Sequence, residues 1–392
     1  MGNKTIYEQR RQLFKYVVGI TINYRKSDVH SEYSYVAKLN PLRPITSFSD
    51  SLENSYARET VILSDVIEGM NNELKKLGLD PIRAPKLFSR SIEKGREAFI
   101  TEDLRIHGFK MSDRFKGMDL NHALFVVKEL GRFHASSLLF EEVLPTKYIP
   151  DTFSRLKGRW FDVNGKEFEI ILEKMFSSSG EAMANYLKKS DTKYKKCANW
   201  LLNYSSTLAR HYFNGFNTCD QFEVLIHGDC WTNNMLFRYN EDEIPVDFRF
   251  VDLQLSGKAS ATSDLNYFFF TSLNGDFRRK NLNTLITTYY ESFSEVLKRA
   301  GKEPPFSYLE LKNELYDRKI FGMASGILSL QFTLVQGEDA PDMENLEEDK
   351  IDDFLEKQIK TFEKLSKQEG PFKDRYLAIF DEMLETTIFD EV

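Results

Sequence analysis

Apolar positions divide the chain into a first part with the period of strands and a longer second part with the period of helices. Residues 13–39 alternate between apolar and polar side chains, as half-buried strands do, and Pro41 ends this pattern. A helical period follows over residues 56–78, and residues 84–104 indicate two further strands around a Lys-Gly turn. The beginning of the chain therefore predicts a small sheet with one main helix.

Helical periodicity dominates from residue 119 onward. Apolar residues recur every three or four positions in LNHALFVVKELGRFHASSLLF, residues 120–140. Residues 233–254 read as two strands joined by a polar turn. Further helices are expected at about 181–214, 276–300, 307–335 and 349–392.

These patterns predict an α+β fold with two lobes. The sheet-rich N-terminal lobe would cover residues 1–104, and the larger, mainly helical C-terminal lobe residues 105–392. A chain of 392 residues exceeds the usual size of a single core, so two lobes are expected. The hydrophobic content of 41%, with 14% aromatic residues, is enough for a sizeable core and argues against disorder.

Charge and cysteine usage restrict the class of protein further. A formal net charge of -7 argues against a general nucleic-acid binder, which would show a basic domain or stripe. Cys197, Cys219 and Cys230 have neither metal-like nor redox-like spacing and fit a reducing compartment. No signal peptide and no apolar run of membrane-spanning length is recognisable, so we expect a cytoplasmic protein without membrane contact. The oligomeric state stays open.

One polar island interrupts the apolar pattern between two strand-like runs. It is VLIHGDCWTNNMLF, residues 224–237, in which Asn234 follows Asp229 by five positions. Protein kinases use this spacing in H-R-D-x-x-x-x-N, where the Asp accepts the proton of the substrate hydroxyl and the Asn holds magnesium. Asp252, at the end of a later strand, stands where a second metal ligand is required.

Phosphoryl transfer explains why these residue types are needed together. The group in transfer carries charge that magnesium neutralises, and magnesium takes oxygen ligands. Another carboxylate must lie near the acceptor hydroxyl to orient it and take its proton. The alternative is that Asp229 and Asn234 cap the backbone of a turn, and that Asp252 is an ordinary strand-end carboxylate. The coincidence of residue type, spacing and strand context favours the phosphotransfer site.

A lysine and a glutamate of the first lobe would position the triphosphate. Lys38 lies near the end of a predicted strand, on the same face as Val36. Glu59 is the preferred partner because it shares the inward apolar stripe of the next helix with Ile62, whereas Glu53 lies on a less buried face.

Two blocks of sequence resemble the ecdysteroid kinase-like family, also described as CHK kinase-like or juvenile-hormone-inducible proteins and found mainly in insects. One block is FITEDLRIHGFKMSDRFKGMDLNHALFVVKELGRFHASSL, and the other comprises HGDCWTNNMLFRY, VDFRFVDLQLS and SDLNYFFFTS. The resemblance covers about residues 30–390 and implies the protein-kinase-like, bilobal fold shared with choline kinases and aminoglycoside phosphotransferases. It also implies phosphorylation, with ATP and Mg²⁺, of a hydroxyl on a small molecule such as an ecdysteroid, another hydroxylated steroid or a xenobiotic.

The motif match implies a role for each matching residue. Asp229 would be the catalytic base, and Asn234 and Asp252 the metal ligands. Lys38 and Glu59 would be the phosphate-positioning pair.

Other residues would support this site. His227 and Asp264 would brace the catalytic loop, and residues 99–104 would form the hinge that holds adenine through backbone groups. His134 lies beside the apolar stripe of its helix and is interpreted as a packing residue rather than a metal ligand.

The beginning of the chain departs from the family. Gly19 stands alone in a strand-like run, so the glycine-containing loop over the phosphates is missing or unrecognisable, and the first lobe is expected to be shortened at its start. This departure motivates a second hypothesis, a non-catalytic nucleotide- or ligand-binding pseudokinase. A protein kinase is less favoured because Asp252-Leu253-Gln254 replaces D-F-G and no A-P-E segment occurs.

The residues that bind the acceptor are not identified by any motif. Aromatic residues of the later helices could line a sterol-sized cavity or serve as ordinary packing residues. Examples are Tyr289, Tyr290 and Phe293.

Overall fold

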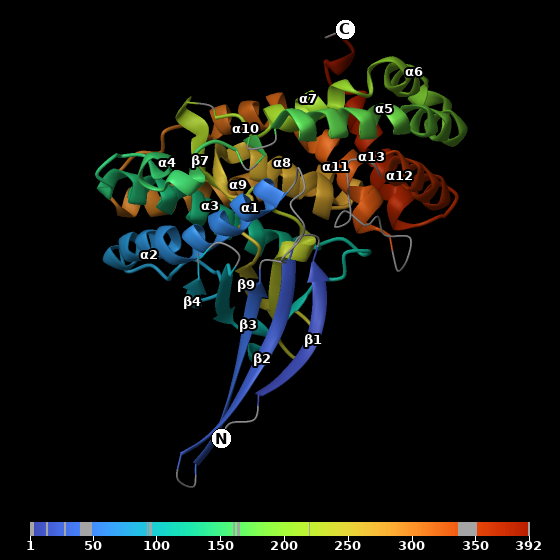
Figure 1. Cartoon of the computed structure of the whole chain (residues 1–392). Coiled ribbons are helices and arrows are strands. Elements are labelled where there is room, and N and C mark those ends of the chain that lie inside the picture. Colours follow the sequence, from blue (N-terminus) through green and yellow to red (C-terminus); the bar gives the residue numbers. More distant parts are fainter. Residues whose placement is uncertain are drawn as a thin grey trace.

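The computed structural model describes residues 4–12, 15–26, 29–39, 49–91, 93, 96–159, 161–162, 165–218, 220–335 and 351–390. Its first part is a five-stranded antiparallel sheet in the order β1-β2-β3-β5-β4. In Figure 1 this sheet lies at one end of the molecule, and the helices of the later part form the other. The strands are β1 (Lys4–Gln12), β2 (Lys15–Lys26), β3 (Val29–Leu39), β4 (Leu87–Ser91) and β5 (Ala98–Glu102).

The helix predicted between these strands is present and begins earlier than expected. It consists of α1 (Ser49–Val61), a π-helical turn (Ile62–Val66) and α2 (Ile67–Lys76). Strand β1 was not predicted, because its sequence is rich in charged and amide side chains. The turn that joins it to β2, and the Lys-Gly turn before β5, lie outside the described residues.

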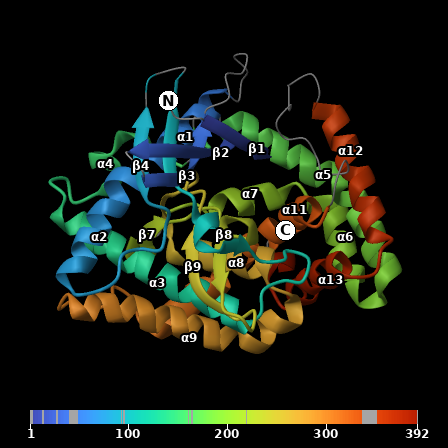
Figure 2. The same ribbon diagram turned by 90° about the horizontal axis from the view of Figure 1, so that it is seen from below.

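Helices make up most of the rest of the chain, as predicted. In Figure 2, α3 runs beside α9, and these two helices pack along each other. The helices are α3 (Leu120–Val143), α4 (Ile149–Thr152), α5 (Gly165–Ser190), α6 (Lys195–Tyr204), α7 (Thr207–Asn214), α8 (Ala261–Ser272), α9 (Gly275–Arg299), α10 (Tyr308–Asp317), α11 (Lys319–Thr333), α12 (Ile351–Ser366) and α13 (Pro371–Met383).

Three of the expected helical segments are divided, and the last of them, at 349–392, forms α12 and α13. The segment expected at 181–214 begins at Gly165 and forms three helices, since the side chain of Asp191 accepts a hydrogen bond from Lys193 N and caps a turn after α5. The segment expected at 307–335 is split at Arg318 into α10 and α11. Residues 336–350 lie outside the described residues.

Two small sheets and one central helix build the framework of the polar island. The strands β6 (Phe109–Met111), β8 (Met235–Tyr239) and β9 (Pro245–Phe250) form one antiparallel sheet, and β7 (Glu223–Ile226) pairs with β10 (Gly257–Ser260) in the other. Every residue of α8 is buried, so this helix lies in the core with neighbours on all sides.

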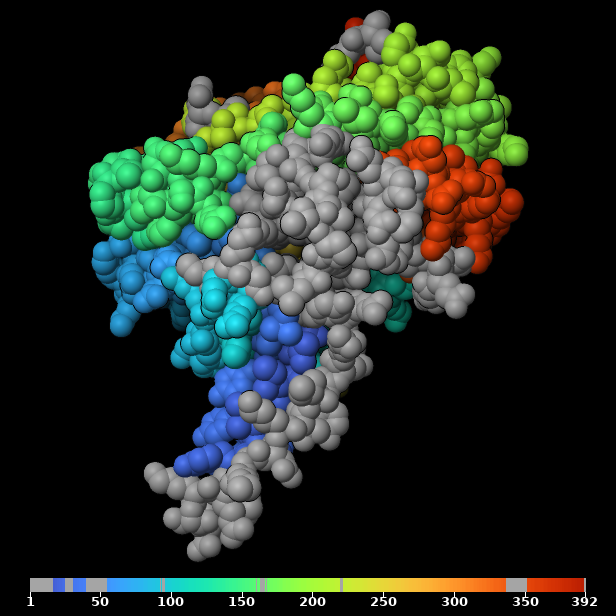
Figure 3. Space-filling model, in the orientation of Figure 1, coloured from blue at the N-terminus to red at the C-terminus, as the bar shows by residue number. Residues whose placement is uncertain are grey.

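An antiparallel sheet followed by a mainly helical region is the two-lobed, kinase-like architecture that the sequence predicts. Figure 3 shows the coloured residues of β2 and β3 as a narrow projection from the broad helical part. The proposed boundary after residue 104 falls in a short 3-10 turn, Leu104–His107, and stays a prediction. Among the described helices, none combines the length and the apolar character needed to cross a membrane.

Candidate active site

The polar island begins where β7 ends, at His227-Gly228-Asp229. β7 is anchored by buried Val224, Leu225 and Ile226. The backbone of Gly228 then turns through a φ of +82°, and a Cβ there would lie 2.3 Å from the carbonyl oxygen of Leu255. Only glycine fits this close approach, which explains why the kinase arginine has no counterpart here.

A buried carboxylate on α8 holds the backbone of this turn. Asp264 accepts hydrogen bonds from His227 N at 2.7 Å and from Gly228 N at 3.0 Å. His134 lies 3.1 Å from Asp264 Oδ2 through Nε2, and 2.8 Å from the Tyr289 hydroxyl through Nδ1. Burial alone would raise the pKa of Asp264, but the contact with His134 and its other partners outweighs burial and keeps this pKa below its usual value.

His227 links the two ends of the island. Its Nδ1 accepts a hydrogen bond of 3.3 Å from Asp229 N, and its Nε2 lies 3.2 Å from the carbonyl oxygen of Val251. Because Nδ1 is the acceptor, Nε2 carries the hydrogen and donates to Val251. The side chain thereby ties the Asp229 turn to the residue that precedes Asp252.

Both oxygens of the Asp229 carboxylate accept hydrogen bonds. Asn234 Nδ2 donates to Oδ2 at 2.7 Å, and the Tyr267 hydroxyl donates to Oδ1 at 2.9 Å. Burial first, and the charge of Asp252 second, raise the pKa of Asp229 above its usual range. The carboxylate is thus fixed in orientation and is a stronger base than an exposed aspartate.

The hairpin of β8 and β9 brings Asn234 and Asp252 to one place. Met235 pairs with Phe250, and Val251 N donates to Asn234 O at 3.0 Å, so the residues flanking the hairpin meet at its open end. Asp252 itself has a φ of +63°, a left-handed conformation that is uncommon outside glycine and is found at functional sites.

The oxygen atoms of Asn234 and Asp252, at the open end of the β8–β9 hairpin, suit a magnesium ion bound together with a nucleotide. Asn234 uses its amide nitrogen for Asp229, so its amide oxygen is left as a ligand atom beside the Asp252 carboxylate. In the part of the chain that the structure describes, no three or more His, Cys, Asp or Glu side chains form a metal cage. Magnesium at phosphates needs only one or two protein oxygens, since phosphates and water complete its shell.

Lys38 connects the sheet of the first lobe to this site. Its Nζ lies 2.6 Å from Glu59 Oε1 and 3.2 Å from Asp252 Oδ1. Burial opposes the charged form, but Asp252 and Glu59 outweigh it and raise the pKa of Lys38 above its usual value. The structure thus brings together Lys38 on β3, Glu59 on α1 and Asp252 after β9.

The expected hinge includes β5 and the residue after it. Asp103 accepts a hydrogen bond of 2.6 Å from Ser34 on β3 and hydrogen bonds from both the backbone and the side chain of Arg105. Asp103 therefore fastens the first sheet to the start of the connection between the lobes.

Three residues at the site were either not predicted from the sequence or were predicted only as packing residues. Arg58 precedes Glu59 and is fully buried, Tyr267 contacts Asp229, and His134 contacts Asp264. The spacing of Tyr267, one helical turn after Asp264, is a signal that could have singled it out. His134 is buried as predicted, but it also supports the carboxylate that holds the loop.

The aromatic residues of α9 pack within the protein. Tyr289 and Phe293 are fully buried, and Phe293 stacks on Phe306 with ring centroids 4.9 Å apart. Tyr290 donates a hydrogen bond from its hydroxyl to the carbonyl oxygen of Phe306. The structure therefore supports the interpretation of these three aromatic residues as packing residues rather than as the lining of a sterol-sized cavity.

Comparison with known protein families gives a match. The profile of the ecdysteroid kinase-like family matches residues 15–302, which is most of the chain and includes all the site residues described above. No curated protein matches the chain.

Proposed function

The chain belongs to the ecdysteroid kinase-like family, and on this premise we propose that it is an ATP- and magnesium-dependent phosphotransferase acting on a hydroxyl of a small molecule. Membership implies a kinase-like small-molecule phosphotransferase. The proposed acceptor is an ecdysteroid or another hydroxylated steroid or xenobiotic.

The observation that carries the proposal is the convergence of four charged or amide side chains from distant segments. Asp229 lies 2.7 Å from Asn234 Nδ2, and Asp252 Oδ1 lies 3.2 Å from Lys38 Nζ. A surface turn that merely caps its own backbone would not bring Lys38 from the other lobe, 214 positions away along the chain, to Asp252.

Each residue has a part in the proposed reaction. Lys38, held by Glu59, would bind phosphate oxygens of the nucleotide. Asn234 and Asp252 would hold magnesium, which when bound neutralises charge on the phosphates. Asp229 would orient the acceptor hydroxyl and take its proton as the oxygen attacks the γ-phosphorus and the bond to ADP breaks.

Mass spectrometry can test the proposed reaction. The protein is incubated with magnesium-ATP and a mixture of ecdysteroids, other hydroxylated steroids and phenols. We expect one acceptor to gain a phosphate, with an equal amount of ADP formed. If the folded protein phosphorylates none of them but binds ATP, the result contradicts an active kinase and favours the non-catalytic alternative.

A further inference from the structure

The side chain of Tyr267 contacts the proposed base at the carboxylate oxygen that Asn234 does not use. It lies on α8, is 8% exposed, and donates its hydroxyl to Asp229 Oδ1 at 2.9 Å. The other oxygen, Oδ2, takes the hydrogen bond from Asn234. The two oxygens of Asp229 therefore face two different surroundings, one shared with a proposed metal ligand and one with a tyrosine.

One face of α8 supports both the backbone and the side chain of the base. Asp264 and Tyr267 are three positions apart, so they lie on the same face of the helix. Asp264 accepts hydrogen bonds from the two residues before Asp229, and Tyr267 donates to Asp229 itself. A single buried helix thus fixes both the path of the loop and the rotation of the carboxylate.

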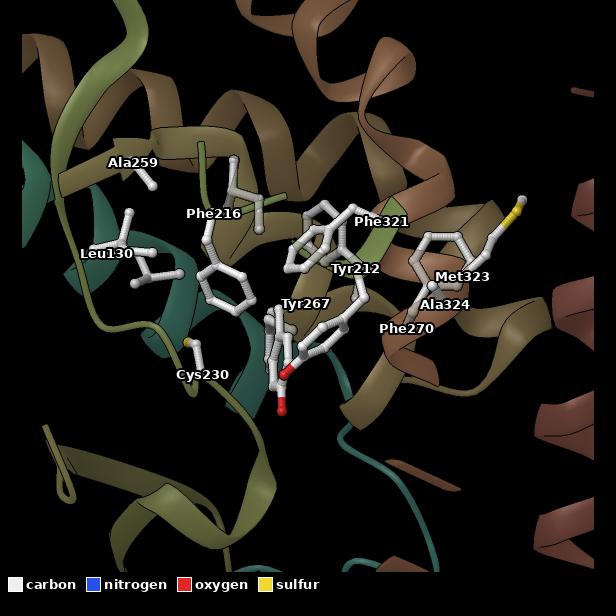
Figure 4. Packing of buried hydrophobic residues seen from close by; sticks show 14 of the residues in the cluster. Leu130, Tyr212, Phe216, Cys230, Ala259, Tyr267, Phe270, Phe321, Met323 and Ala324 are labelled. Carbon is white, nitrogen blue, oxygen red and sulfur yellow. The ribbon is translucent and has the colours of Figure 1, made fainter. Parts of the chain in front are cut away.

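Packing alone does not require a hydroxyl at this position. The next three residues of α8 are Phe268, Phe269 and Phe270, all buried, and Tyr267 packs its ring on Phe321 with centroids 6.2 Å apart. A phenylalanine would fill the same space. In Figure 4 the rings of Tyr212, Tyr267 and Phe321 lie close together, and both tyrosine rings contact the ring of Phe321.

We infer that Tyr267 is a positioning residue for the proposed base, and that it marks the side of Asp229 at which the acceptor hydroxyl arrives. This inference rests on the proposed function. Asn234, a proposed metal ligand, donates to Oδ2 and would place the nucleotide on that side, so the acceptor approaches from the Oδ1 side, where Tyr267 lies.

The test is Tyr267→Phe, which removes only the hydroxyl. The assay follows transfer of the γ-phosphate of magnesium-ATP to ecdysone and to water. Because a hydrogen bond to a charged group is lost, kcat should fall about ten- to a hundredfold, while the Kd of magnesium-ATP, measured by calorimetry, stays unchanged. Tyr376→Phe is the matched control, since this buried tyrosine hydroxyl has no hydrogen-bond partner in the described part of the chain, and it should keep the wild-type kcat.

A double substitution separates positioning from a general structural effect. If Tyr267 acts through Asp229, adding Tyr267→Phe to Asp229→Asn should cost no further rate in single-turnover assays. A kcat of Tyr267→Phe equal to that of the wild type, or two effects that multiply, would overturn the inference and leave the proposed function standing. If the wild type transfers phosphate neither to these two acceptors nor to any member of the mixture of ecdysteroids, other steroids and phenols, the proposed function fails and the role of Tyr267 fails with it.

Discussion

Gly228 takes a φ of +82°, and a Cβ at this position would lie 2.3 Å from the carbonyl oxygen of Leu255. The glycine therefore meets two separate requirements, a left-handed backbone and a close approach of another chain segment. Because the next residue is Asp229, a shift of this turn would displace the proposed base. The glycine of the H-G-D motif is thus a geometric condition for the site.

Substitution of this glycine tests that condition. Gly228→Ala should lower the free energy of unfolding by about 2 kcal/mol or more, because strain in φ and the contact with a backbone oxygen add together. Gly301→Ala is the control, since Gly301 also has a positive φ of 72° but has nothing within 4 Å of an added Cβ. The Gly301→Ala substitution should lower the free energy of unfolding by only about 1 kcal/mol, the cost of the left-handed backbone alone. Equal losses for the two variants in urea unfolding would contradict the proposed close contact.

At the scale of elements, helix α1 is attached to the second lobe by one buried guanidinium. Arg58 donates to the carbonyl oxygens of Ser256 at 3.1 Å, Lys157 at 3.0 Å and Gly158 at 2.8 Å. The next residue, Glu59, contacts Lys38. The three carbonyls belong to segments far from α1 in the sequence, so Arg58 keeps the helix where the Lys38–Glu59 pair can form.

Loss of this attachment should affect both stability and nucleotide binding. Arg58→Met leaves buried carbonyl oxygens without a donor and should lower the free energy of unfolding by about 3 kcal/mol. It should also speed hydrogen exchange in α1 and raise the Kd of magnesium-ATP. Arg90→Met is the control, because Arg90 forms an ion pair with Asp65 at the surface, and such pairs contribute less than about 1 kcal/mol. Unchanged exchange in α1 would count against the attachment.

At the scale of the whole molecule, periodicity and motif spacing predicted the two-lobed arrangement. The five-position spacing from Asp229 to Asn234 and the strand before Asp252 are local in sequence, so they can be read without a structure. The pairing of Lys38 with Glu59 was also predicted from periodicity, because Lys38 shares a strand face with an apolar residue and Glu59 lies on the inward apolar stripe of its helix. These predictions depend on short-range patterns.

The remaining contacts of the site depend on packing between distant segments. The contact of Tyr267 with Asp229 joins residues 38 positions apart, and the contact of His134 with Asp264 joins residues 130 positions apart. Single residue types do not reveal such contacts, because a buried tyrosine or histidine on an apolar helix looks like a packing residue. Strand β1 was missed for a related reason, since its polar side chains hide its pairing with β2.

We propose that Asp229 is the base of a phosphotransfer reaction, and the substitution Asp229→Asn tests this role most directly. The measurement compares transfer of the γ-phosphate of magnesium-ATP with the Kd of magnesium-ATP for wild type and variant. Asp276→Asn is the control, because the Asp276 side chain is 96% exposed. We predict that Asp229→Asn lowers kcat about 10²- to 10⁴-fold and leaves nucleotide binding intact. A wild-type rate of transfer in Asp229→Asn would contradict the account.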